Sequence, residues 1–253
     1  MGSFGVISQT GNNTQTEGLV FYVDPAYKKS YPRSGTTTFN LASGSLDGTI
    51  NGATWDGINP TSSFNFDGTD DFVDCTDNDI FSFTDDSNDF PYTFSAWIYV
   101  DSLSTDSNQP NTIISKYATS ANEWWFLIEN KKLVIINYDQ SNPTIIGRKY
   151  NTDLVINTWY YVAATYDGSK NVSGFKLYLN GTRVDDTDYN GNTTYGGMQN
   201  QTTNVYIGKR DRSDRLSLFN GQTGPINVYN RVLSAGDVLQ NYNAQKGRFG
   251  LWK

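Results

Sequence analysis

Residues 92–100, Tyr-Thr-Phe-Ser-Ala-Trp-Ile-Tyr-Val, form the stretch of sequence that decides the fold. Aromatic and β-branched residues dominate it, and such residues favour strands. Successive side chains of a strand point to opposite faces, so this segment presents a different set of residues on each side. One face carries Phe94, Ala96 and Ile98, and the other carries Ser95, Trp97 and Tyr99.

Further strands are predicted on both sides of this stretch, and turn dipeptides such as Asp67-Gly68, Asp167-Gly168 and Asn180-Gly181 follow several of them. A single helix is predicted near the end, where Ser234 and Asp237 form a variant capping box and the helix runs to about Asn243. Short strands with one late helix predict an all-β, two-sheet antiparallel sandwich. The predicted strands are residues 18–23, 63–66, 71–75, 92–100, 112–116, 124–129, 132–138, 159–166, 175–179, 205–208 and 224–230.

Composition and length favour one domain. The chain has 253 residues, of which 15% are aromatic, and Glu17, Glu123 and Glu129 are its only glutamates. This amino-acid composition favours strands over helices. Residues 1–17 are polar and rich in Gly, Asn and Thr, which predicts a flexible N-terminal arm. We expect residues 18–253 to form a single domain without an internal boundary.

Several classes of function are disfavoured by the charged and reactive residues. The chain has no His and a single Cys, Cys75, which excludes a His-based catalytic site and a zinc site built from Cys clusters. A net charge of −7 makes nucleic acid an unfavourable partner and gives no attraction to an anionic membrane. No run approaches eighteen apolar residues, so no membrane span is expected.

Five sequence motifs of the chain, taken in order, resemble motifs of laminin-G-like, concanavalin A-like lectin domains. The resemblance covers about residues 18–245 and implies a jelly roll of two antiparallel sheets. The motifs are residues 66–73 (FDGTDDFV), 94–98 (FSAWI), 112–116 (TIISK), 159–181 with its WYYVA, YDG and LYLNG elements, and 230–234 (NRVLS).

Two further motifs resemble structural proteins of tailed bacteriophages that carry this domain. They are Asp24-Pro25 followed by residues 29–32 (KSYP), and residues 241–250 (NYNAQKGRFG). The resemblance implies a virion or extracellular location and other virion proteins as partners. It agrees with residues 1–17, which have neither a cation nor an apolar run and therefore predict no signal peptide.

Catalysis is not expected, although a glycoside hydrolase of the same fold is a distant third hypothesis. Glucanases of this fold resemble a pattern of Glu-x-Asp-x-x-Glu on one strand, which places two carboxyl groups across the scissile bond. That pattern cannot be written with the three glutamates of this chain, since Glu123 and Glu129 lack the middle Asp. We therefore predict a protein that is not an enzyme.

Calcium is the metal that the sequence favours, because any site must be built from oxygen ligands. Asp67, Asp70 and Asp71 lie within five residues, and Asp24 at the end of the first predicted strand is a comparable candidate. The alternative is that Asp67-Gly68 simply makes the turn and the other carboxylates are solvated. The stretch 224–228 (GPINV) lacks the Asp that many members of the resembling family have there, which puts their calcium site in doubt.

The main functional prediction is non-catalytic recognition of a cell-surface or extracellular glycan by aromatic faces and fixed polar groups. Trp124 and Trp125 are neighbours on a predicted strand, so they point to opposite faces and at most one belongs to the core. The alternative is a structural capsid or fibre decoration protein that binds only other virion proteins. The candidate sugar contacts are Lys116, Tyr117, Trp124, Trp125, Arg148 and Arg210.

Overall fold

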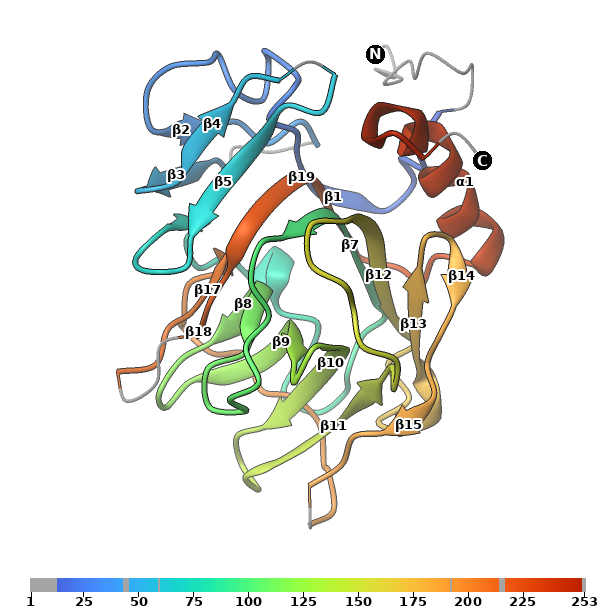
Figure 1. Cartoon of the computed structure of the whole chain (residues 1–253). Coiled ribbons are helices and arrows are strands. Elements are labelled where there is room, and N and C mark those ends of the chain that lie inside the picture. Colours follow the sequence, from blue (N-terminus) through green and yellow to red (C-terminus); the bar gives the residue numbers. More distant parts are fainter. Residues whose placement is uncertain (1–12, 43–45, 59, 192, 214–216, 252–253) are drawn as a thin grey trace.

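The computed structural model describes residues 13–42, 46–58, 60–191, 193–213 and 217–251. Two large antiparallel sheets pack against each other as a sandwich, with a short helix beside one of them (Figure 1). The predicted all-β jelly-roll sandwich is confirmed. No helix in the described part of the chain has the length and apolar character needed to traverse a bilayer.

The first sheet has eight strands in the order β14-β13-β12-β7-β19-β5-β4, and β1 pairs with β19 off this path. Residues 92–100 form β7, which lies inside this sheet and pairs with β12 on one side and β19 on the other. The strand bounds are β1 Leu19–Val23, β4 Thr54–Asp56, β5 Ser63–Asp67, β7 Tyr92–Val100, β12 Trp159–Tyr166, β13 Phe175–Leu179, β14 Thr182–Arg183 and β19 Asn220–Tyr229.

The second sheet has nine strands in the order β15-β11-β10-β9-β8-β16-β6-β3-β2, and a separate two-stranded ribbon, β17-β18, contacts β8. The bounds are β2 Thr37–Thr38, β3 Gly48–Asn51, β6 Phe72–Asp74, β8 Asn111–Tyr117, β9 Asn122–Glu129, β10 Lys132–Asp139, β11 Thr144–Lys149, β15 Thr187–Asp188, β16 Tyr206–Ile207, β17 Lys209–Arg210 and β18 Ser217–Leu218.

The main core lies between the sheets, and a second apolar cluster covers the opposite face of β7. Phe94 and Ile98 belong to the main core, whereas Trp97 packs in the second cluster with Tyr161 and Phe249. Alternation along β7 therefore buries both of its faces, because C-terminal residues cover the side that would otherwise meet water.

The C-terminal cover consists of α1 (Ala235–Gln245) and the 3-10 helix η3 (Lys246–Phe249). The predicted capping box is confirmed, since Ser234 and Asp237 satisfy each other's backbone N–H groups. The helix runs two residues beyond the predicted end at Asn243. The two other 3-10 helices are η1 (Asp79–Phe81) and η2 (Val172–Gly174).

The last strand is longer than the sequence predicted, because β19 begins at Asn220 rather than at Gly224. Its register with β7 shifts between Thr223 and Ile226, around Pro225. Proline has no backbone N–H to donate to the ladder, so a bulge is the natural way to keep it inside a strand.

The predicted N-terminal arm is described only from residue 13 onward, and residues 1–12 lie outside the described residues. Gln15 donates its backbone N–H to the Asn241 side chain and accepts from the Tyr229 hydroxyl through its carbonyl oxygen. The Arg231 guanidinium donates to the Glu17 carbonyl oxygen. Residues of this segment therefore contact α1 and the end of β19.

Candidate functional site

An aromatic cluster lies on the outer face of the nine-stranded sheet, away from the main core. Tyr117 of β8 and Trp125 of β9 have ring centroids 5.4 Å apart, and Tyr138 of β10 lies 5.6 Å from Tyr117. Leu127, Val134 and Ile136 form its apolar floor, and Ile145 and Tyr189 pack at its edge. Strand alternation explains the set, because Trp125 and Leu127, like Val134, Ile136 and Tyr138, are spaced two residues apart. We call Tyr117, Trp125, Tyr138 and Tyr189 the outer aromatic face.

The β17-β18 ribbon adds cations to this face. The Arg210 guanidinium carbon lies 4.1 Å from the Trp125 ring centroid and 5.9 Å from that of Tyr117. The neighbouring Lys209 ammonium lies 4.4 Å from the Phe72 ring centroid and 4.8 Å from that of Tyr206. Cations over aromatic faces are favourable, and they fix the ribbon on the sheet.

Polar groups complete the outer aromatic face. The Tyr189 hydroxyl donates to the Glu129 carboxylate at 2.9 Å, and the Lys149 ammonium lies 5.2 Å from the Tyr189 ring centroid. Burial raises the pKa of Tyr117 to about 12, so its hydroxyl stays protonated and can donate at neutral pH. Aromatic faces with hydroxyl, carboxylate and guanidinium groups suit a polar ligand with an apolar face, such as a sugar ring.

The structure brings together three of the six predicted sugar contacts, namely Tyr117, Trp125 and Arg210, although each is only 6% exposed. Trp124 points the other way, as alternation predicts; it is fully buried in the main core, and its ring N–H donates to the Phe81 carbonyl. Lys116 pairs with Trp124 in the sheet and is also fully buried. Neither residue has surface with which to contact a ligand here.

Arg148 is separated from the outer aromatic face by the sheet itself. It pairs with Ile135 of β10, a main-core residue, whereas its neighbour Lys149 lies on the outer side. Its guanidinium forms an ion pair with Asp188 and lies 3.6 Å from the Asp185 carboxylate. Arg148 therefore joins β11 to β15 through Asp188 and to the segment before β15 through Asp185.

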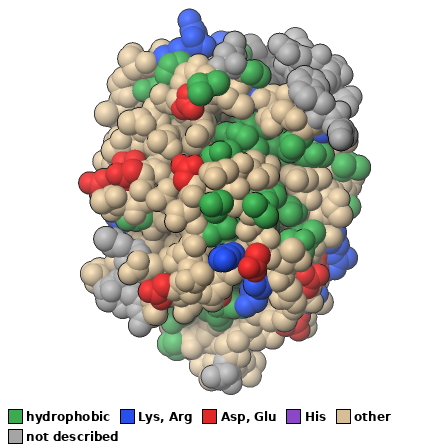
Figure 2. Space-filling model, viewed as in Figure 1, with side chains coloured by type: hydrophobic (Ala, Val, Ile, Leu, Met, Phe, Trp, Pro, Cys, Tyr) green, Lys and Arg blue, Asp and Glu red, His purple; other side chains and the backbone are tan. Residues whose placement is uncertain are grey.

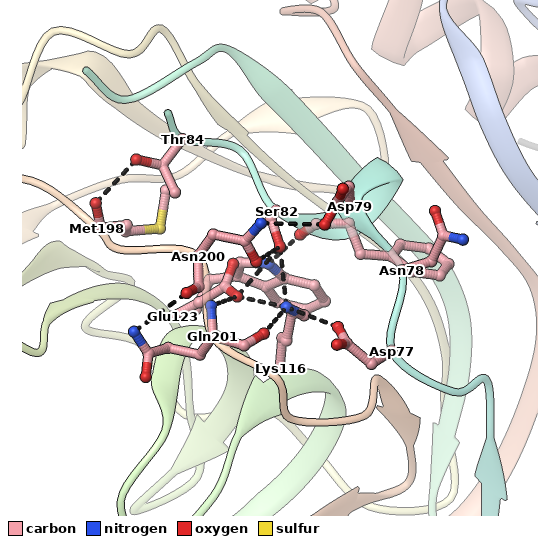
Figure 3. Close-up of polar contacts among 12 residues, drawn as sticks. Asp77, Asn78, Asp79, Ser82, Thr84, Lys116, Glu123, Met198, Asn200 and Gln201 are labelled. Carbon is pink, nitrogen blue, oxygen red and sulfur yellow. Dashed lines mark hydrogen bonds and ion pairs between the residues drawn. The ribbon is translucent and has the colours of Figure 1, made fainter. Parts of the chain in front are cut away.

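A β-bulge turns Glu123 inward. Lys116 pairs with Trp124 and Tyr117 pairs with Asn122, so Glu123 has no partner in the ladder. An unpaired bulge residue escapes the strict alternation that would otherwise place Glu123 on the same side as Trp125. Figure 3 shows the result, in which the Glu123 carboxylate and the Lys116 ammonium point toward each other.

Lys116 is held by oxygen atoms from three parts of the chain (Figure 3). Its ammonium donates to Glu123, to the Ser82 hydroxyl at 2.8 Å and to the Gln201 carbonyl oxygen at 2.5 Å, and it lies 3.0 Å from Asp77. Glu123 also accepts the backbone N–H of Gln201 at 2.8 Å. Burial raises the pKa of Glu123 to about 7, against the opposing effect of Lys116. The sequence offered no signal for this pair beyond the two residue types.

The predicted metal ligands Asp67, Asp70 and Asp71 do lie together. One carboxylate oxygen from each falls within 4.8 Å of the others. Asp71 is buried and accepts the backbone N–H of Asp67, and burial, followed by the charges of Asp67 and Asp70, raises its pKa. These hard oxygen donors fit a cation such as calcium.

Asp24 lies elsewhere and has other partners. The Arg248 guanidinium binds its carboxylate through two hydrogen bonds of 2.8 Å, and the Tyr22 hydroxyl donates to it at 3.1 Å. Asp24 thus joins the end of β1 to η3, and the Arg248 guanidinium already neutralises its buried carboxylate.

Tyr138 and Tyr189 are functional candidates that the sequence analysis missed. Tyr138 had a usable signal, since Val134, Ile136 and Tyr138 alternate on a predicted strand. Tyr189 had none, because it lies just after a two-residue strand.

Comparison with known proteins identifies relatives at the level of family and fold. A family model described as the concanavalin A-like lectin/glucanases superfamily matches residues 67–239. No curated protein matches the chain.

Solved structures match over 90% of the chain at low sequence identity. The receptor binding domain of botulinum neurotoxin C/D mosaic serotype matches with a TM-score of 0.64 and 14% identity, over 51% of its own length. The binding domain of botulinum neurotoxin DC in complex with SialylT matches with a TM-score of 0.62 and 15% identity, and that of Paraclostridial Mosquitocidal Protein 1 with 0.62 and 16%, each over 52% of its length. The chain thus spans about half of these structures, and the likeness concerns the fold alone.

Proposed function

Because the chain belongs to the concanavalin A-like lectin/glucanases superfamily, we propose that it is a non-catalytic carbohydrate-binding domain that holds a glycan on the outer aromatic face. The observation that carries the proposal is the position of Tyr138 and Tyr189, which are partly exposed, beside the buried Tyr117, Trp125 and Arg210 on the side of the nine-stranded sheet that faces away from the main core. Sugar rings stack on aromatic faces while fixed polar groups select their hydroxyls.

The surroundings of Glu123 and Glu129 favour binding without catalysis. A glycosidase needs two carboxyl groups about 5–10 Å apart on either side of an accessible bond. Glu123 is fully buried against Lys116, and Glu129 accepts hydrogen bonds from Tyr189. Neither glutamate is placed as half of such a pair.

The fold neighbours are consistent with the proposal without establishing it. One is a toxin binding domain in complex with SialylT, and another comes from work on a toxin whose cell entry depends on two ganglioside molecules. For the present chain we propose a cell-surface or extracellular glycan, as part of a tailed-phage virion. Antibody against the domain should label purified phage particles under this proposal, and unlabelled particles would remove the virion setting.

A glycan array tests the carbohydrate proposal, followed by titration of the best-bound glycan against variants. We expect Tyr138→Ala to weaken binding by about 1 kcal/mol, roughly fivefold in affinity, because one aromatic contact is lost. Tyr27→Ala is the matched control, since Tyr27 is 43% exposed and lies outside the outer aromatic face.

The result against the proposal is a folded protein that binds no glycan, or equal affinity in both variants. Trp124→Ala is unsuitable for this test because that ring is part of the main core.

A structural decoration role is the second candidate, and one observation favours it. Hydrophobic side chains gather in a band across the face seen in Figure 2, over the region where Figure 1 labels β7, β12 and β13. The structure gives Val155 and Ile156 exposed fractions of 61% and 43%. Exposed apolar side chains in a group often mark protein contacts. Under this alternative Val155→Asp would block incorporation into particles, whereas the lectin proposal predicts no effect.

A further inference from the structure

The segment 195–201 lies outside the strands and helices, and it donates hydrogen bonds to carboxyl groups from several other parts of the chain, including Asp79 and Asp86 through Asn200. Asp89 accepts the Tyr195 hydroxyl at 2.7 Å and the Met198 backbone N–H at 2.8 Å. Asp139 of β10 accepts the Gly196 backbone N–H at 2.7 Å. Glu123 of β9 accepts the Gln201 backbone N–H at the far end. The protonation states of these carboxyl groups therefore bear directly on how the segment is held.

The charges around Glu123 do not balance when every carboxyl group is ionised. Among the described residues, Glu123 and Asp77 both form their ion pairs with the Lys116 ammonium. Lys116 and Glu123 are fully buried, whereas the Asp77 side chain is 33% exposed, so water solvates the Asp77 carboxylate but not that of Glu123.

Hydrogen atoms are also in short supply in this cluster. The three ammonium hydrogens of Lys116 face four oxygen acceptors, which belong to Asp77, Ser82, Glu123 and Gln201. The single Ser82 hydroxyl hydrogen faces two acceptors, Glu123 and Asn200. Four hydrogens thus serve six contacts, so the cluster has fewer donors than acceptors.

The second carboxylate oxygen of Glu123 is where a proton fits. Its Oε1 accepts from Lys116 and Gln201, while its Oε2 is buried and has no hydrogen-bond partner among the described residues. An unpartnered anionic oxygen in such a place is far more costly than an unpartnered hydroxyl.

We propose that Glu123 is a proton-binding switch, protonated on Oε2 at mildly acid pH, which keeps the segment 195–201 closed on the β8–β9 bulge. When the proton leaves, an open segment that lets water reach the buried carboxylate becomes favourable, and this outweighs the stronger hydrogen bond that the anion accepts from the Gln201 N–H. The titratable groups that face Glu123 are Lys116 from β8 and, from the stretch entering η1, Asp77; Asp79 reaches the cluster through the Asn200 side chain. The segment itself faces Glu123 with Asn200 and Gln201, which do not titrate.

The chain has only three glutamates, which makes a direct measurement possible. Protein labelled with ¹³C at the glutamate carboxyl carbon gives one resonance each for Glu17, Glu123 and Glu129. Glu17→Gln and Glu129→Gln variants assign the third resonance by elimination and leave the cluster intact. We expect the Glu123 resonance to titrate near pH 7. A Glu123 titration at pH 4–5 would overturn the proposal.

Amide exchange tests the mechanical part of the switch. We expect the protection of the Gln201 amide, corrected for the intrinsic pH dependence of exchange, to fall about tenfold one pH unit above the midpoint. The Asn157 amide, which donates to the Val100 carbonyl oxygen, is the internal control and should show no such step. In Glu123→Gln the step should vanish. If the protection of the Gln201 amide stays constant while Glu123 titrates, the switch is rejected. Glu123 would then be a carboxyl group with a raised pKa whose protonation does not affect the segment.

Discussion

At the scale of single residues, one ammonium group compensates the charge of two carboxylates at the end of β8. Lys116 is fully buried, which is rare for lysine and is tolerated because Asp77, Glu123, Ser82 and Gln201 surround its Nζ with oxygen. The same lysine was a predicted sugar contact, and its role in the structure is to join β8, β9 and the loops beside them.

Replacing Lys116 should therefore be costly. In Lys116→Ala the buried Glu123 carboxylate loses its cation, and breaking a buried pair on one side typically costs about 3–5 kcal/mol. Urea unfolding followed by tryptophan fluorescence measures the change. Lys28→Ala is the control, because Lys28 is exposed and such changes usually stay within about 0.5 kcal/mol. Equal unfolding midpoints for the two variants would show that the pair contributes nothing to stability.

Residue-level prediction from sequence worked where strand alternation holds and failed where it is interrupted. Alternation correctly put Trp124 and Trp125 on opposite faces, with Trp124 in the core. The bulge at Glu123 is invisible in the sequence, since it depends on a register shift between β8 and β9. Arg148 was a predicted sugar contact, but it lies on the inner side of β11, a strand that the sequence analysis did not predict.

At the scale of elements, the C-terminal 3-10 helix η3 covers part of the outer face of the eight-stranded sheet. The Phe249 ring stacks on Trp97 with centroids 4.1 Å apart and contacts Trp159 at 4.6 Å. A Cβ added at Gly224 of β19 would lie 2.8 Å from the Phe249 ring, so glycine makes room for this ring.

Truncating the Phe249 side chain should destabilise the domain. Phe249→Ala leaves a cavity against Trp97, and such truncations typically cost about 3–5 kcal/mol. Phe39→Ala is the matched control, because Phe39 is 40% exposed whereas Phe249 is 5% exposed. Thermal unfolding compares the two variants, and equal losses would mean that η3 is only loosely attached.

The turn between β5 and β6 is the element to which we assign calcium. Asp67, Asp70 and Asp71 bring three carboxylates together, whereas Asp24 is already paired with Arg248. We propose that calcium binds this turn and stabilises the fold by about 3 kcal/mol when its concentration is 100 times the dissociation constant.

Thermal unfolding with calcium and with a chelator checks the assignment. The rise in midpoint with calcium should disappear in Asp70→Asn and persist in Asp56→Asn, whose carboxylate lies outside the cluster. A rise that both variants keep would place the ion elsewhere, and no rise in the unmodified protein would remove the metal.

Element-level prediction succeeded where local chemistry defines an end. The capping box at Ser234 correctly located α1, and turn dipeptides located β12 and β13. Short strands such as β2, β14 and β15 were missed because two residues carry no periodicity, and they exist only through pairing with longer neighbours. The outer aromatic face was predicted only in part, because its residues come from strands that are distant in sequence. These residues meet only through the order of the strands in the sheet.

At the scale of the whole molecule, buried carboxyl groups of two kinds set the pH dependence of stability. Burial raises the pKa of Glu123, Asp89 and Asp101. In Asp139 and Asp185 burial acts in the same direction, but hydrogen bonds, from Ser141 and from Arg183 respectively, lower the pKa on balance. The first kind favours the folded state at mildly acid pH, and the second kind favours it at higher pH.

The pH of maximum stability should therefore lie on the acid side of neutrality. A carboxyl group whose pKa is raised by folding binds more protons in the folded state, so its contribution is full below the unfolded value and is lost as pH rises through the folded value. For Glu123 this window runs from about 4.5 to about 7, which corresponds to at most about 3 kcal/mol. Asp139 and Asp185 act in the opposite sense and lose their contribution as pH falls below the ordinary value of 3.8.

Urea unfolding at pH 5, 6, 7 and 8 measures this dependence, with stability expected to fall from pH 5 to pH 8. Glu123→Gln should flatten most of the slope, because it removes the group with the widest window. Glu129→Gln is the control, since Glu129 lies at the edge of the outer aromatic face, half-buried beside the Tyr189 hydroxyl. Stability that rises steadily to pH 8 would mean that the Lys116 pair outweighs burial. Glu123 would then be ionised throughout, and Lys116 alone would compensate both carboxylates of the cluster.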